Sequence, residues 1–109
     1  MNLNQTIFNA IQAREFITEF PEGTAKQIGI NWAAVLQGAT ITDSAWSCNL
    51  AGLDISGDAA TDTETTAIIG GAPGRFNLVN TITTSAGETL IRTIKVIISA
   101  VNPPLTDYE

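Results

Sequence analysis

The sequence predicts an all-β fold, a single sandwich of about seven strands, and three observations carry that prediction. Short runs of alternating apolar and polar residues recur along the chain, and turn residues separate them at intervals of roughly eight to twelve positions. Threonine and isoleucine are abundant whereas leucine and lysine are few, a composition that favours strands over helices. The length of 109 residues suits one domain with one core.

A β-hairpin is predicted near the C-terminal end, with strands over Arg75 to Thr84 and Glu88 to Ile98 joined by Ser85-Ala86-Gly87. One face of the first strand is apolar, and Asn80 is its only polar break. The end of the second strand, Ile94 to Ile98, is apolar on both faces apart from Lys95. We therefore expect this strand in the centre of a sheet, or covered on its outer face by a partner.

The earlier strands are shorter and are expected, in chain order, over residues 14–20, 27–33, 45–50, 53–56 and 63–69. The first of them is interpreted as an edge strand that ends at the turn sequence Pro21-Glu22-Gly23. An acidic loop is expected from Asp58 to Asp62, and the glycine-rich stretch from Gly70 to Gly74 is interpreted as the turn that precedes the hairpin.

Trp46 lies in a mid-chain strand and shares one face of it with Cys48 and Leu50. A tryptophan in such a strand is typical of an immunoglobulin-like sandwich, where it spans the space between the sheets. Trp32 is expected beside it or at one end of the core. The predicted core consists of Trp32, Trp46, Phe76, Leu78, Ile82, Ile94 and Val96.

The N-terminal segment, Met1 to Ala13, differs from the rest because its apolar residues recur at a helical spacing. It is predicted to be a short amphipathic helix or an arm that orders on contact; a frayed terminus is the alternative. Its candidate interaction residues are Leu3, Ile7, Phe8 and Ile11. The sandwich itself is expected over 14–100, followed by an extended C-terminal tail over 101–109.

The composition argues against catalysis and against a resident cofactor. The chain has no histidine and a single cysteine, Cys48, which excludes Ser-His-Asp, Cys-His and histidine-rich metal sites. The glycine-rich stretch lacks the lysine and the following helix of a phosphate-binding loop. The densest carboxylate group, Asp54, Asp58, Asp62 and Glu64, does not follow the spacing of a calcium loop, so no metal site is predicted either.

The net charge and the hydropathy pattern limit the classes of partner that we expect for this chain. The net charge is −6 with five basic residues, so nucleic acid is not an expected partner. No apolar stretch approaches the length of a membrane-spanning helix or has the flanks of a secretory signal, so no membrane partner is expected and synthesis is expected in the cytoplasm. Open strand edges in a small sandwich favour pairing with other protein chains.

Several of these residues together resemble a family of small immunoglobulin-like structural proteins of tailed bacteriophages and prophages, often labelled fibre-tail adaptors. The similarity covers roughly Gln27 to Ser99. The residues that carry it are Trp32, Leu36, Gly38, Thr40-Ile41, Ser44, Trp46, Gly52-Leu53, Gly70-Gly71, Gly74, the run from Asn80 to Gly87, and Arg92. The resemblance implies a structural role in the virion.

The first functional hypothesis is a non-enzymatic capsid decoration or cement protein that oligomerises and binds neighbouring subunits of the particle. One alternative is a tail or baseplate fibre adaptor, and another is a glycan- or receptor-binding module on the virion surface. The expected partners are the major capsid protein or the tail and fibre proteins, and the expected location is the virion, after synthesis in the host cytoplasm.

Overall fold

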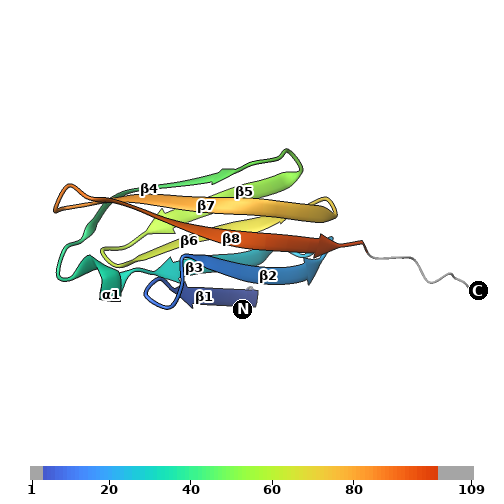
Figure 1. The fold of residues 1–109 in the computed structure, drawn as a ribbon. Helices are drawn as coiled ribbons and strands as arrows, with labels where there is room; N and C mark the ends of the chain where they lie inside the picture. Colours follow the sequence, from blue (N-terminus) through green and yellow to red (C-terminus); the bar gives the residue numbers. More distant parts are fainter. Residues whose placement is uncertain (1–3, 101–109) are drawn as a thin grey trace, which may run out of the picture.

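The protein is an all-β sandwich in a computed structural model that describes residues 4–100 (Figure 1). Its eight strands form two four-stranded sheets, and one short helix, α1, lies in a connection. The elements are, in chain order, β1 (Asn4–Asn9), β2 (Glu15–Pro21), β3 (Lys26–Asn31), α1 (Ala33–Leu36), β4 (Ile41–Cys48), β5 (Leu53–Ala60), β6 (Glu64–Gly71), β7 (Gly74–Thr84) and β8 (Thr89–Ser99).

The first sheet has the strand order β1-β3-β6-β5 and the second has the order β2-β8-β7-β4. In Figure 1, β7 and β8 cross in front of β5 and β6, which shows the two layers. The predicted hairpin is present, with β7 and β8 paired from Gly74 opposite Ile98 to Thr83 opposite Thr89. As predicted, β8 is central in its sheet, between β2 and β7.

The N-terminal segment is a strand, so the prediction of a short helix is wrong over Asn4–Asn9. These residues pair in parallel with β3, from Asn4 opposite Lys26 to Asn9 opposite Asn31. An isolated helix of this length is marginal in water, whereas the open edge of β3 supplies backbone partners. The predicted boundary between an arm and a sandwich therefore falls inside the fold. Leu3 and the predicted tail over 101–109 lie outside the described residues.

Three other elements depart from the expected ranges. β5 extends to Ala60, although the sequence predicts a loop from Asp58 onward. Its register with β6 shifts between Ser56 and Ala59. β4 begins at Ile41, ahead of the predicted start. The apolar residues after Trp32 form α1, whose first turn is held by the Ala33 N–H donating to Asn31 Oδ1 at 3.0 Å.

The core lies between the sheets and reverses the expected roles of the two tryptophans. Trp32 is fully buried, whereas Trp46, on edge strand β4, is only partly buried. The other five predicted core residues, Phe76, Leu78, Ile82, Ile94 and Val96, are all buried. Cys48 packs partly against this core, but Leu50, expected on the same face, is 56% exposed because β4 ends at Cys48.

A chain of hydrogen bonds crosses the core and explains the polar break in β7. The Trp32 indole N–H donates to Thr65 Oγ1 at 3.0 Å, and the Thr65 hydroxyl donates to Asn80 Oδ1 at 2.7 Å. The Asn80 amide then donates to Ser44 Oγ and to Ala45 O, both at 3.1 Å. Thr65 belongs to the first sheet and Asn80 to the second, so the chain fixes their relative position.

Replacing Gly71 by alanine should destabilise the fold by about 2 kcal/mol or more. Gly71 has φ +136°, and a Cβ there would overlap the carbonyl oxygen of Gly52. Gly87→Ala is the matched control, because Gly87 also has a positive φ, +83°, but has open space around it. Urea unfolding of both variants measures the difference. Equal losses of stability would show that the backbone contact at Gly52 does not constrain the turn.

Candidate interaction surfaces

The outer face of the second sheet is a regular surface that strand alternation creates. Its residues point away from the core because they alternate with buried neighbours in each strand. They are Glu15, Ile17 and Glu19 of β2, Ile91, Thr93, Lys95 and Ile97 of β8, and Arg75, Asn77, Val79, Thr81 and Thr83 of β7. Ile17 is 64% exposed and Ile91 is 51% exposed, which makes this face partly apolar.

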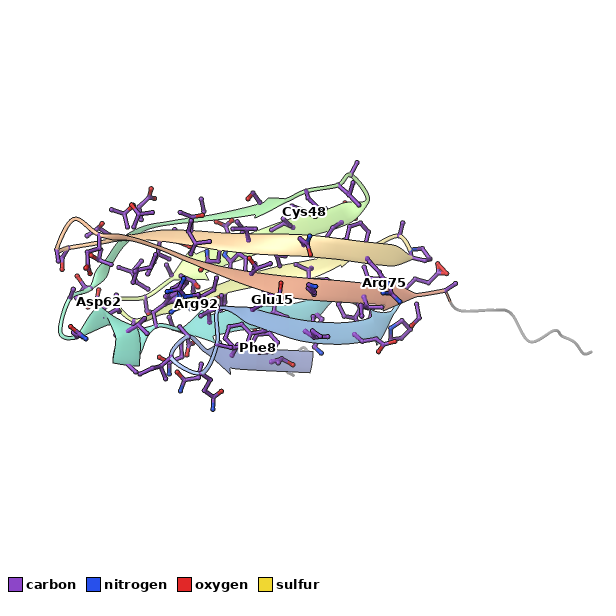
Figure 2. All side chains as sticks on the ribbon, viewed as in Figure 1. Phe8, Glu15, Cys48, Asp62, Arg75 and Arg92 are labelled. Carbon is purple, nitrogen blue, oxygen red and sulfur yellow. The ribbon has the colours of Figure 1, made fainter. Side chains whose placement is uncertain are left out.

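This face carries few charged groups, and the ion pair on it is long and exposed. Lys95 Nζ lies 3.8 Å from Glu15 Oε1, across the parallel pair of β2 and β8, and both side chains are about half exposed (Figure 2). An exposed pair of this kind contributes little to stability. The face therefore combines isoleucine and threonine with a few exposed charged side chains, a composition suited to contact with another protein.

One edge of the sandwich, where edge strands β4 and β5 lie, is acidic. Asp43, Asp58 and Asp62 line a shallow hollow between residues 41–44 and 58–62. The sequence has no lysine or arginine from Gln27 to Gly74, so no basic side chain of β4, β5 or β6 offsets these carboxylates. In Figure 2, Asp62 and Arg75 lie toward opposite ends of the sandwich. The charge is thus unevenly distributed over the surface.

The carboxylate group that the sequence singled out does not form a metal centre. The four residues are spread over β5, the loop that follows it and the start of β6: Asp54 and Asp58 lie in β5, Asp62 in the loop, and Glu64 begins β6. Among residues 4–100, no three histidine, cysteine, aspartate or glutamate side chains are placed to hold a metal ion together. In the same part of the chain, no helix is long and apolar enough to cross a membrane.

The predicted interaction residues of the N-terminal segment have different environments. The Ile7 side chain, 37% exposed, covers Gly29 of β3, since a Cβ on Gly29 would lie 2.7 Å from Ile7 Cδ1. The Phe8 ring stacks on Phe16 with ring centroids 4.8 Å apart, between β1 and β2. Ile11, in the turn that follows β1, is 59% exposed. Phe8 is therefore engaged inside the fold.

Arg92 anchors the turn between β1 and β2, a role that sequence reasoning missed. Its Nε donates to Ala10 O at 2.9 Å, and its guanidinium carbon lies 5.3 Å from the centroid of the Trp32 ring (Figure 2). Burial and, secondarily, the positive charge of Arg14 lower the pKa of Arg92 below its ordinary value. The only signal in the sequence was a basic residue in an apolar strand.

A comparison with a solved structure supports the sandwich fold. The PKD domain from KIAA 1837 protein superposes with a TM-score of 0.57 at 11% identity, over 87% of this chain and 89% of that one. A cysteine protease inhibitor from Entamoeba histolytica has a TM-score of 0.49 at 12% identity, over 90% of this chain and 98% of the inhibitor. At these identities the likeness concerns the fold alone.

Comparisons at the sequence level give one result. No curated protein matches the chain. A family model described as "Podophage GP4 fiber-tail adaptor protein gp77" matches residues 23–97. The match runs from the turn after β2 almost to the end of β8, so it includes six of the eight strands.

Proposed function

Because the chain belongs to the podophage GP4 fiber-tail adaptor family, whose members are structural proteins of the virion, we propose that it joins the phage tail to the fibres without catalysing a reaction. The observation that carries this proposal is the family match over β3 to β8. It favours the tail-fibre alternative over the first hypothesis of capsid decoration. Resemblance to the wider phage family, expected from the sequence, is confirmed by the same match.

Two surfaces of different character support an adaptor role. The outer face of the second sheet offers Ile17 and Ile91 with threonines between them, whereas the acidic side at β4 and β5 offers Asp43, Asp58 and Asp62. Different chemistry lets two partners bind without competing for one site. We assign the outer face to one of the two phage partners, and the acidic side to a partner with a basic surface.

Glycan binding is less well supported. Sugar-binding sites usually present exposed aromatic rings. Among residues 4–100, Phe20, Trp32 and Phe76 are buried, Trp46 is partly buried, and Phe8 and Phe16 stack on each other. The part of the chain that the structure describes therefore offers no aromatic platform of the kind that sugars stack on.

Disrupting the gene should give particles that have heads and tails but carry no fibres and do not adsorb to cells. Adding the purified protein back should restore fibre attachment, and immunogold labelling should place it at the tail. Electron microscopy of the particles and a plaque assay check both results. Labelled heads, or unstable heads on particles that keep their fibres, would support capsid decoration instead.

A matched pair of variants tests the outer face in the same add-back assay. Ile17→Lys places a charge on that face, and Leu50→Lys places one in the turn between β4 and β5, where the side chain is 56% exposed. Both should fold normally, because neither side chain is buried. We expect attachment to fail with Ile17→Lys and to proceed with Leu50→Lys. The reverse result would move the binding site away from the second sheet.

A further inference from the structure

Four strands lie at sheet edges, and three of them carry features that prevent pairing with another chain. β2 has Glu15, Glu19 and a terminal proline, Pro21. β4 has a register irregularity between Ile41 and Asp43, and β5 has one between Ser56 and Ala59. Charged residues, prolines and bulges are the usual means by which natural sheets protect their edges.

β1 has none of these features. Its register with β3 is unbroken from Asn4 to Asn9, and residues 4–13 contain no charged residue and no proline. The next strand in the sheet, β3, is already occupied by β1 and β6. The free side of β1 is therefore a regular, uncharged strand edge, the type of edge to which another strand adds.

The backbone phase of β1 shows which groups face outward. Alternate residues of a parallel strand direct both backbone groups to the same neighbour. The Ala10 N–H donates to Asn31 O at 2.9 Å, so even-numbered residues of this segment face β3. It follows that the N–H and C=O groups of Gln5 and Ile7 face away from the sheet. These groups can accept a further strand without breaking the existing pairing.

Charge identifies a second copy of this chain as the occupant. The net charge of −6 opposes self-association through most of the surface, and the edges at β2, β4 and β5 all carry acids. β1 is the edge at which two copies meet without placing carboxylates opposite each other. A partner attracted by charge would instead favour the acidic edges.

We propose that two copies of this chain pair through β1, antiparallel and about a two-fold axis at Ile7. In this register Ile7 lies opposite Ile7 of the second copy, and the two residues exchange N–H···O=C bonds, while Gln5 lies opposite Asn9. The two four-stranded sheets become one continuous sheet, and the half-exposed Ile7 side chains cover each other. This interface gives a structural basis to the oligomerisation expected from the sequence, and it goes beyond the proposed adaptor role.

Sedimentation velocity of the purified full chain should show a concentration-dependent change from monomer to dimer at concentrations up to about 1 mM. Ile7→Lys should weaken dimerisation at least about tenfold, because it brings two like charges together on the axis. Ile17→Lys is the matched control: it makes the same change at a more exposed isoleucine on the other N-terminal strand, and should dimerise as the unchanged chain does.

A second variant tests the same interface in case Ile7→Lys does not fold. Gln5→Pro removes an outward-facing N–H that the fold does not use, so thermal unfolding should change little while dimerisation weakens. A chain that stays monomeric at all concentrations, or a dimer that Ile17→Lys disrupts and Ile7→Lys does not, would overturn the proposal. Fibre attachment is measured separately, in the add-back assay. A failure of the adaptor role can therefore be distinguished from a failure of dimerisation.

Discussion

Trp32→Ala should lower the free energy of unfolding by about 3 to 5 kcal/mol, the largest effect expected from a single substitution in this chain. The indole is fully buried, packs under the guanidinium of Arg92, and donates to Thr65. Truncation leaves a cavity and an unpaired Thr65 lone pair. Because small domains are stable by only about 5 to 15 kcal/mol, the variant should be close to unfolding at room temperature.

Trp46→Ala provides the comparison, since it makes the same change at a partly buried site on edge strand β4. Its cost should be clearly smaller than that of Trp32→Ala. Phenylalanine variants separate packing from hydrogen bonding: Trp32→Phe loses the bond to Thr65, whereas the Trp46 indole N–H has no hydrogen-bond partner among the described residues. Denaturant unfolding followed by circular dichroism measures all four. A greater loss of unfolding free energy for Trp46→Ala than for Trp32→Ala would show that Trp46 is the central tryptophan of the core.

Asn80→Leu should cost about 2 to 4 kcal/mol even though it makes the core more apolar. The substitution leaves the Thr65 hydroxyl without its acceptor and Ala45 O without the side-chain donor, both next to a fully buried position. Leucine has the branched shape of asparagine, but its two methyl groups are bulkier than the amide oxygen and nitrogen, so strain adds to the loss. Unfolding in urea measures the effect.

Thr65→Val completes a double-mutant cycle for this bond. Each single change breaks the Thr65 to Asn80 hydrogen bond, so the double variant should cost less than the sum of the two. The shortfall measures the coupling between the two sheets at this point. Additive costs would mean that the hydrogen-bond chain contributes to each site independently and does not hold the sheets in position.

The sequence was sufficient for the hairpin of β7 and β8 because both strands have a long alternation and a clear turn between them. It was not sufficient for β1, whose apolar spacing resembles a helix although its backbone partner is β3, a residue range more than twenty positions away. β5 was underestimated because the small residues after Ser56 carry no alternation, and only backbone pairing with β6 identifies them as a strand. Such pairing is a tertiary effect that no local pattern encodes.

The candidate surfaces also divide into features that the sequence pattern predicts and features that depend on the tertiary structure. The acidic character between Gln27 and Gly74 is readable from residue order alone. By contrast, the choice between Trp32 and Trp46 depended on which strand lies at a sheet edge, and the function of Arg92 depended on the position of Ala10. Both required the three-dimensional arrangement of the strands.

The parallel pairing of β2 with β8 has a mechanical consequence. The ladder runs from Glu15 opposite Thr93 to Pro21 opposite Ser99, and further backbone bonds at Thr93 to Arg14 and at Glu22 to Ser99 extend it at both ends. A force that pulls the N-terminal end of β2 and the C-terminal end of β8 in opposite directions loads all these bonds at once, in shear. An antiparallel pair pulled from one end would open one bond at a time. The sandwich is thus built to transmit tension along its length.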